Sequence, residues 1–272
     1  MAFQRFPSTL KASVTAASHT WIVGSASAMP PSYLCYIYVS YYVNLSDYEN
    51  ERHPMSLFRL DASILPATSA SRSLADLVEA EWTASHPNST VTRRDLAADP
   101  VPATAWSDAV TGGTVAPEER TERQREARAL ASTLADELLA ADALLFAVPL
   151  YNYGVSQHFK TWFDVAYTDP RIDPTGTALR GKPATLVTVL GGNYDPGTPK
   201  EGWDHSTPWL RRVLEDVWGL DLRVVQRPFT LVGVNPAMDA FADAAKELKE
   251  NAEADARTYG QELAAARGAG VA

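Results

Sequence analysis

The stretch 142–154 constrains the fold of this 272-residue chain more than any other. Residues 142–148 form an apolar run of strand length, of the kind that lies buried in a parallel sheet. Pro149 ends the run, because proline has no N–H to donate to a strand ladder. A tight loop of tyrosine, asparagine and glycine follows, and Phe159 and Trp162 then recur at helical spacing. This pattern is typical of a ligand loop in an open α/β sheet, or of an ordinary connection whose tyrosines cap the core.

From Met55 onward, apolar strands alternate with amphipathic helices. Strands are predicted at 57–63, 89–96, 142–148, 183–190 and 222–225, the last with a possible extension to 232. Helices are predicted from Ser69 or Ser71 as N-cap through Trp82, from Pro117 to Ala141, from Gly154 to Tyr167, from Pro208 to Trp218 with Gly219 beyond its end, and from Pro236 to about Ala266. The stretches 99–114, 168–181 and 195–207 are predicted to be loops. This order predicts one doubly wound α/β domain at 55–268, a five-stranded parallel sheet with helices on both faces.

Residues 1–54 differ in composition from the rest of the chain. They are rich in Ser, Tyr and Pro without a clear period, and their acidic and basic side chains balance. The net charge of −9 therefore arises downstream of them. Met55 begins a segment that leads directly into the first predicted strand. We expect Met55 to be the natural start and 1–54 to be an upstream extension without a fold; a genuine tail or lid is the alternative.

Charge and cysteine content bound the partners and the compartment. A net charge of −9 without a basic cluster disfavours a nucleic-acid partner. Cys35 is the only cysteine and cannot form an internal disulfide, which favours a reducing, cytoplasmic location. The apolar run at 33–43 is too short to span a membrane, and its tyrosines make it a poor signal peptide. We therefore expect no membrane partner.

Loops at three predicted strand ends carry the groups of a candidate site. After the first strand, Ser63, Ser69 and Ser71 lie where hydroxyls, free N–H groups and the helix dipole can hold a phosphate, although plain helix capping is the alternative. No dinucleotide fingerprint or P-loop pattern is present. After the fourth strand, Gly191 and Gly192 let a flat ligand approach the backbone. Together with the aromatic loop after the third strand, these groups suit a phosphorylated planar cofactor such as FMN.

Three motifs carry a resemblance to a known family. They are D-A-S-I-L-x-x-x-S-x-S at 61–71, V-P-L-Y-N-Y-G-V-S at 148–156 with K-T-W-F-D at 160–164, and G-G-N-Y at 191–194. The chain resembles the FMN-dependent NADH-azoreductases, a flavodoxin-like family that includes NAD(P)H:quinone reductases. The resemblance covers essentially all of 55–268 and none of 1–54.

The resemblance implies a specific FMN site. The phosphate would be held by Ser63, Ser69, Ser71 and the amide of Ala70, the isoalloxazine would be lined by Leu150, Tyr151, Asn152 and Tyr153, and its other edge by Gly191 and Gly192. The sequence departs from the family at Val189 and Leu190, where Ser-Arg is frequent, and at Ala70, where a polar residue is common. These departures bear on the affinity for FMN more than on the fold.

The resemblance also implies a two-step reaction. NADH would give a hydride to one FMN per subunit and leave, and a quinone or an azo compound would then take the electrons. The flavin would carry the chemistry, so that no catalytic side chain is required. A homodimer with the flavin at its interface is implied as well, and exposed Trp and Phe on the helix at 155–167 would be consistent with it. The choice between NADH and NADPH stays open.

The sequence leaves two alternative functions and offers few residues for other kinds of catalysis. A non-enzymatic flavodoxin-like electron carrier or flavin-binding module is the main alternative, and a family member that has lost FMN is a weaker one. His86 and His158 are expected to be solvated, while His205 lies in a loop that could cover the site but is more readily structural. The histidines and the cysteine show no metal-ligand spacing, so no metal is expected. Ser63 lacks the G-x-S-x-G context of a hydrolase nucleophile.

Overall fold

The computed structural model describes residues 54–65 and 68–266. Residues 1–53, on which the hypothesis of an upstream extension rests, lie outside this part of the chain. Within the described residues, no helix combines the length and the apolarity needed to cross a bilayer.

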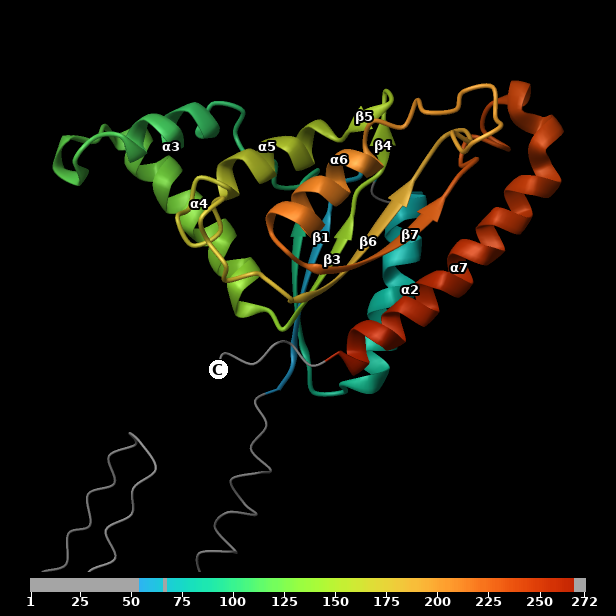
Figure 1. Ribbon diagram of the computed structural model, residues 1–272, viewed down its shortest axis with the longest axis horizontal. Helices are drawn as coiled ribbons and strands as arrows, with labels where there is room; N and C mark the ends of the chain where they lie inside the picture. Colours follow the sequence, from blue (N-terminus) through green and yellow to red (C-terminus); the bar gives the residue numbers. More distant parts are fainter. Residues whose placement is uncertain (1–53, 66–67, 267–272) are drawn as a thin grey trace, which may run out of the picture. The chain divides into compact units, whose positions relative to one another are not determined.

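Five parallel strands form the central sheet, as the sequence predicted. They are Ser56–Asp61 (β1), Thr90–Asp95 (β2), Ala143–Ala147 (β3), Pro183–Val189 (β6) and Asp221–Arg227 (β7), in the spatial order β2-β1-β3-β6-β7 (Figure 1). β3 and β6 lie inside the sheet and are buried along their whole length, which explains their continuous apolar sequences. β2 lies at one edge and carries exposed polar side chains.

Helices cover both faces of the sheet. They are Ala70–Ser85 (α2), Ala105–Gly113 (α3), Glu122–Ala140 (α4), Gln157–Ala166 (α5), Thr207–Arg211 (α6) with its π-helical continuation Arg212–Val217, and Ala242–Ala265 (α7); short 3₁₀ turns lie at Pro117–Glu119 and Pro236–Phe241. α2 and α7 pack on one face, and α3 to α6 lie on the other (Figure 1). Successive strand side chains point to opposite faces, so that Leu57 joins the cluster under α2 while Phe58 joins the cluster on the other face. The predicted doubly wound fold is confirmed.

Two predicted boundaries were wrong for reasons of tertiary packing. The stretch 99–114, expected to be a loop, contains α3, whose small residues Ala109 and Gly112 are buried against α4. A Cβ at Gly112 would lie 3.0 Å from Gln124 Cβ, so this close packing holds a helix that propensity alone would not predict. The fifth strand ends at Arg227, and residues 229–232 are not a strand.

The aromatic side chains of α5 are buried, contrary to expectation. Phe159 and Trp162 are fully buried and Phe163 is 5% exposed. Phe146 of β3 lies against the first two rings, with centroid distances of 6.3 and 6.2 Å. These rings fill the core of the protein's own domain, so they provide no support for a dimer.

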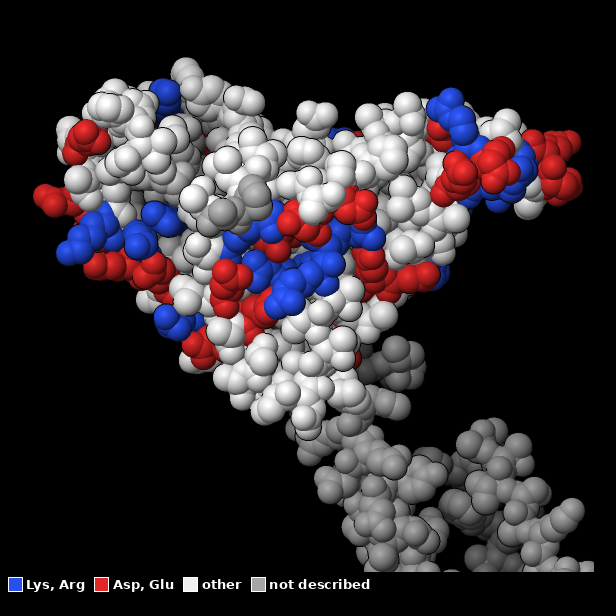
Figure 2. Space-filling view, turned by 180° about the vertical axis from the view of Figure 1, so that it is seen from behind, with Lys and Arg blue, Asp and Glu red and all other residues white. Residues whose placement is uncertain are grey.

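Charged side chains are intermixed on the face seen in Figure 2. Acidic and basic groups alternate across the middle of that face, and no single-sign patch dominates it.

Candidate cofactor and substrate site

The candidate site lies at the carboxyl ends of the parallel strands. The chain leaves β1 toward β2 on one side and later enters β3 on the other side of β1, so the order of connections reverses between β1 and β3. Ser63 follows β1, and the two-stranded hairpin Leu150–Tyr151 (β4) and Gly154–Val155 (β5) follows β3. Figure 1 shows the hairpin beyond the tips of the strand arrows.

Ser69 and Ser71 form a polar cradle at the start of α2. Ser69 is the N-cap, as predicted, and its Oγ accepts a hydrogen bond from the N–H of Arg72 at 3.3 Å. Ser71 Oγ lies 3.0 Å from Ser69 Oγ, and both side chains are buried. The N–H groups of Ala70 and Ser71 belong to the first helical turn and have no acceptor within the helix. Two hydroxyls, free N–H groups and the positive end of the helix dipole make this cradle suitable for an anion.

Tyr151 connects the loop after β1 with the loop after β3. Its Oη accepts a hydrogen bond from the N–H of Ile64 at 3.1 Å and lies 3.2 Å from Ser63 Oγ. Ser63 Oγ also accepts from the N–H of Leu65 at 3.2 Å. Ser156 provides a second link, because its Oγ donates to Ala62 O at 3.2 Å. Tyr151, expected to line a flat ring, therefore also holds the serine loop in place.

Arg72 is a part of the site that the sequence analysis missed. One of its Nη atoms donates to Ser63 O at 3.2 Å and to Asp95 Oδ1 at 2.8 Å, and the other lies 3.6 Å from Asp61 Oδ2. The guanidinium is thus held by two carboxylates below the serine loop and fixes the carbonyl of Ser63. The sequence contained one signal of this network: the two charged residues Arg59 and Asp61 within a strand that is otherwise apolar.

This ion-pair network shifts the pKa values of its members. Burial by itself would raise the pKa of Asp95, but the hydrogen bond from Arg72, with the N–H groups of Ala97 and Ala98, lowers that pKa below its ordinary value. Burial would lower the pKa of Arg59, but Asp61 and its other carboxylate partners raise it instead. Both groups therefore stay charged in the folded protein at neutral pH.

The β4–β5 hairpin presents its turn residues to solvent. Asn152 and Tyr153 have φ values of +50° and +65°, the left-handed conformation of a two-residue hairpin turn. Leu150 is buried, whereas Tyr153 is 39% exposed. The turn thus offers an amide and a phenol ring at the mouth of the site.

The glycine loop after β6 is less open than the sequence suggested. A Cβ at Gly191 would lie 2.8 Å from Leu231 Cδ1, so the side chain of Leu231 occupies this space. The N–H groups of Leu231 and Phe229 donate to the carbonyls of Gly191 and Gly192, each at 3.2 Å. At Gly192 a Cβ would only touch the ring of Tyr194. The loop after β7 therefore covers the glycine loop.

The residues before this loop contribute to packing. Val189 and Leu190 are both buried. Leu190 O accepts hydrogen bonds from the N–H and the Oγ1 of Thr230, each at 3.0 Å. Where the resembling family frequently has Ser-Arg, this chain thus has two core residues.

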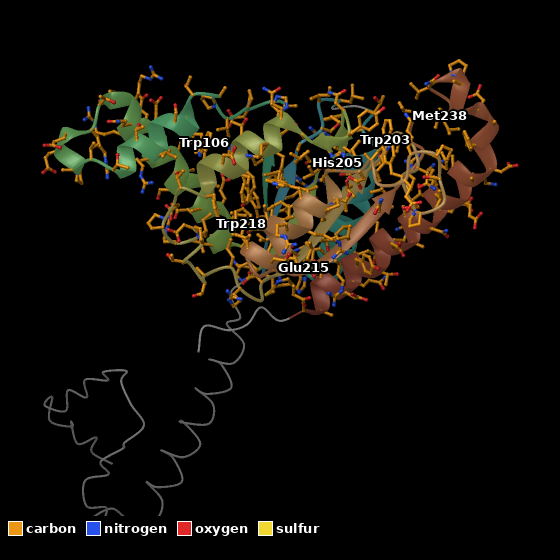
Figure 3. The ribbon with its side chains drawn as sticks, turned by 45° about the horizontal axis from the view of Figure 1, so that its top comes forward. Trp106, Trp203, His205, Glu215, Trp218 and Met238 are labelled. Carbon is orange, nitrogen blue, oxygen red and sulfur yellow. The ribbon has the colours of Figure 1, made fainter. Side chains whose placement is uncertain are left out.

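An aromatic cluster borders the hairpin turn. The ring of Tyr153 lies 5.3 Å from that of Trp203 and 6.1 Å from that of Tyr194. The N–H of His205 donates to Tyr153 O at 3.0 Å, so His205 supports the turn through its backbone while its side chain is exposed. Figure 3 shows Trp203 and His205 on the loop that precedes α6. His86 and His158 differ from expectation in being half-buried, and His86 ends α2 with its ring 4.5 Å from that of Trp82.

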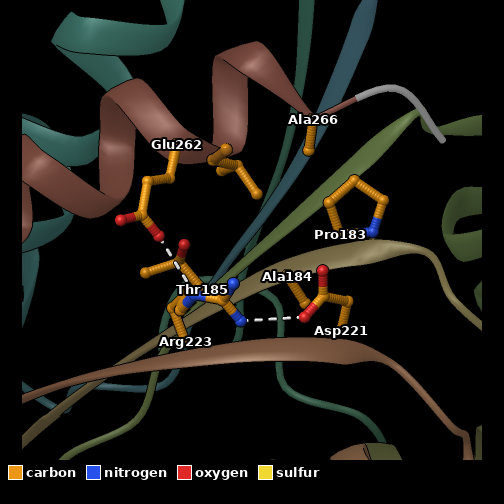
Figure 4. Close-up of a pocket in the computed structure, with 8 residues that line it drawn as sticks. Pro183, Ala184, Thr185, Asp221, Arg223, Glu262 and Ala266 are labelled. Carbon is orange, nitrogen blue, oxygen red and sulfur yellow. Dashed lines mark hydrogen bonds and ion pairs between the residues drawn. The ribbon is translucent and has the colours of Figure 1, made fainter.

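A separate depression lies at the other end of the strands, where β6 and β7 begin. Pro183 and Asp221, the first residues of β6 and β7, line it together with the end of α7 (Figure 4). Arg223 spans it by ion pairs with Asp221 at 2.8 Å and Glu262 at 3.0 Å. These pairs close the depression with the chain's own charges, and it shares no residue with the site at the carboxyl ends of the strands.

Comparison with known proteins identifies the family. A profile described as flavodoxin-like fold matches residues 55–255. The chain belongs to this family. A relative from Frankia casuarinae, named FMN-dependent NADH:quinone oxidoreductase, is 39% identical over 204 residues, which are 74% of this chain and 96% of the relative. A Streptomyces coelicolor protein of the same name is 37% identical over 212 residues, 76% of this chain and 94% of the relative.

Solved structures show the same fold. An azoreductase from Bacillus anthracis has a TM-score of 0.64 at 21% identity, covering 76% of this chain and 99% of that one. An FMN-dependent NADH-azoreductase from the same species, in complex with FMN, has a TM-score of 0.56 at 18% identity, covering 74% and 99%. The resemblance inferred from the three motifs is confirmed by the profile match and by the relatives of 37–39% identity.

Proposed function

We propose that this protein is an FMN-dependent oxidoreductase that transfers electrons from NADH to quinones and aromatic azo compounds. The observation that carries the proposal is the buried pair Ser69 and Ser71 at the start of α2, whose neighbour Arg72 binds the carbonyl of Ser63. The hydroxyl of Ser63 in turn lies 3.2 Å from Tyr151 Oη of the hairpin after β3. Relatives with 39% and 37% identity that are named FMN-dependent NADH:quinone oxidoreductase support it.

The chemistry of the donor set fits a flavin mononucleotide. The hydroxyls of Ser69 and Ser71 and the N–H groups of the first turn of α2 would hold the phosphate, with Ala70 contributing its amide. The hairpin residues 150–153 would contact the isoalloxazine on one side, and Gly191 and Gly192 would border its other edge. Ser63 has its hydroxyl engaged by Tyr151 and Leu65, so it would support the loop and could reach the phosphate only through exchange of a partner.

The protein's own residues would bind and orient rather than transfer protons. Bound FMN would supply the group that accepts and then returns a pair of electrons. Tyr151 and Arg72 would keep the serine loop in the binding geometry, and the aromatic rings of Tyr153 and Trp203 would limit access of water to one edge of the site.

The domain, the assembly and the compartment belong to the same proposal. Residues 55–268 would form the flavin domain, supported by the profile match at 55–255 and by β1 beginning at Ser56. A cytoplasmic homodimer would place a second copy against the carboxyl edge of the sheet. Ile64 and Leu65 at this edge are 52% and 54% exposed, and Leu231 is 43% exposed, as an apolar interface requires. Neither nucleic acid nor membrane would be a partner.

One anaerobic experiment tests the reaction. The full chain is loaded with FMN, freed of unbound flavin and mixed with NADH while the flavin absorbance is followed. Bleaching by NADH and recovery on addition of a quinone or an azo dye are the expected results. If the protein retains flavin that NADH cannot reduce, the proposed enzymatic activity is refuted and an electron carrier is favoured. If no flavin is retained, the proposal that FMN is the cofactor is refuted.

A further inference from the structure

Lys200 lies beside an aromatic pair at the mouth of the candidate site. Its Nζ is 5.4 Å from the ring centroids of both Tyr153 and Trp203 and 3.3 Å from Tyr153 Oη. The two rings meet edge to face at an interplanar angle of 75°. The ammonium group therefore lies against the ring of Trp203 and beside the phenol oxygen of Tyr153, an arrangement in which the cation is stabilised without an opposite charge.

Lys200 forms no ion pair with any carboxylate among the described residues. The neighbouring acidic side chains bind backbone instead, since Glu201 accepts from the N–H of Gly197 at 2.8 Å and Asp204 accepts from those of Ser206 and Thr207 at 2.8 and 2.9 Å. Lys160 shows the contrast, because it pairs with Asp164 at 2.6 Å.

Lys200 lies between two of the loops that form the candidate site. Tyr153 belongs to the turn that follows β3, and Lys200 and Trp203 belong to the loop that follows β6. The hydrogen bond from His205 N to Tyr153 O holds the two loops together at 3.0 Å. In a chain with a net charge of −9, an unpaired cation here makes the local field attractive to an anion that the whole protein repels.

We propose that Lys200, Tyr153 and Trp203 form a subsite that selects planar aromatic electron acceptors carrying an anionic group, such as sulfonated or carboxylated quinones and azo compounds. The proposal rests on the proposed function and names its preferred substrate class. Tyr153 and Trp203, which are 39% and 47% exposed, would contact the acceptor's ring system, one by its face and the other by its edge, because their rings are nearly perpendicular. The ammonium of Lys200 would pair with the sulfonate or carboxylate. A neutral acceptor would gain only the aromatic contact.

Steady-state kinetics with a matched pair of acceptors tests the selectivity. The FMN-loaded full chain is assayed at saturating NADH with anthraquinone-2-sulfonate and with 2-(hydroxymethyl)anthraquinone. For Lys200→Gln we expect kcat/KM to fall about two- to fivefold for the sulfonate, as for the loss of an exposed ion pair, and to stay unchanged for the neutral quinone. Lys200→Arg should retain the preference. Trp203→Leu should lower kcat/KM about two- to tenfold for both acceptors.

A matched control and a second readout separate this proposal from the proposed function. Lys249→Gln removes a lysine charge from α7, where Lys249 pairs with Glu253 at 3.6 Å. This variant should leave kcat/KM unchanged for both anthraquinones. Binding of anthraquinone-2-sulfonate to the oxidised protein, measured by calorimetry without NADH, should weaken in Lys200→Gln and should weaken in the wild type as salt is raised. This readout holds even if turnover fails.

Three results would overturn the subsite. They are an equal effect of Lys200→Gln on the two acceptors, an equal effect in Lys249→Gln, or a rise in the KM for NADH with the quinone parameters unchanged. The last result would indicate that Lys200 contacts NADH and not the electron acceptor. Absence of turnover with every acceptor, together with intact salt-dependent binding, would refute the proposed function and leave the subsite standing.

Discussion

Removal of the Ser71 hydroxyl is the most direct test of the phosphate cradle. Ser71 is completely buried, and its Oγ lies 3.0 Å from Ser69 Oγ. Ser71→Ala leaves the helix cap in place, because the N–H of Arg72 donates to Ser69 Oγ and not to Ser71. If the hydroxyl donates to a phosphate, its loss removes one hydrogen bond to a charged group, worth about 1.5–3 kcal/mol. A free-energy difference of about 1.4 kcal/mol changes a dissociation constant tenfold, so the Kd for FMN should increase by a factor of about 10 to 100.

Ser69→Ala should combine this effect with a loss of stability. The substitution removes the helix cap as well, which costs about 1 kcal/mol of unfolding free energy. Ser73→Ala is the matched control, because Ser73 lies in the same helical turn but is exposed, and its Oγ donates to Ser69 O at 3.2 Å. Its Kd for FMN should equal that of the wild type.

The assay is a titration of the flavin-free full chain with FMN, followed by flavin fluorescence, with chemical unfolding of each variant measured in parallel. Wild-type affinity in Ser71→Ala would refute the cradle, provided that the variant unfolds like the control. An equal loss of affinity in Ser73→Ala would also refute it, because the effect would then come from the helix and not from the buried hydroxyls.

Three further predictions concern the packing and the ionic network. Gly260→Ala should lower the unfolding free energy by about 1–3 kcal/mol, since the new Cβ would lie 2.9 Å from Val78 O where α7 crosses α2. Stability should be retained above the ordinary pKa of an aspartate and fall as the pH decreases below it, because the pKa of Asp95 is lowered in the folded state by Arg72 and protonation breaks that pair. Tyr151→Phe should weaken FMN binding about three- to tenfold, because the loop after β1 loses the hydrogen bonds of the phenol.

Each of these predictions has a control. Gly113→Ala should not destabilise the protein, because the added Cβ would only touch Arg128 Nη1 at 3.7 Å, and equal losses at both glycines would contradict the packing argument. Urea unfolding of Asp95→Asn should show a weaker dependence on acidic pH than the wild type, and an unchanged dependence would assign the effect to other carboxylates. Tyr167→Phe, which removes a phenol hydroxyl at the C-cap of α5, outside the candidate site, should bind FMN like the wild type.

The sequence alone determined the order of the five strands of the central sheet and of the helices other than α3, and several of their ends. Runs such as 142–148 are apolar because both faces of a parallel strand are buried, and this pattern is local in the chain. The same holds for the N-cap at Ser69 and for Gly219, which adopts the left-handed conformation expected after a helix with φ +69°. The three loop motifs sufficed to recognise the family, since they bring serine, aromatic and glycine residues to the ends of adjacent strands.

Only the tertiary structure decided how those loops interact. Nothing in the local sequence brings Leu231 over Gly191, Arg72 between Asp61 and Asp95, or Lys200 between Tyr153 and Trp203. The same is true of the aromatic face of α5, which is buried because β3 and the α6 region pack on it. Periodicity reports which side of an element is apolar. What that side meets depends on contacts between residues far apart in the chain, which form only when the sheet assembles.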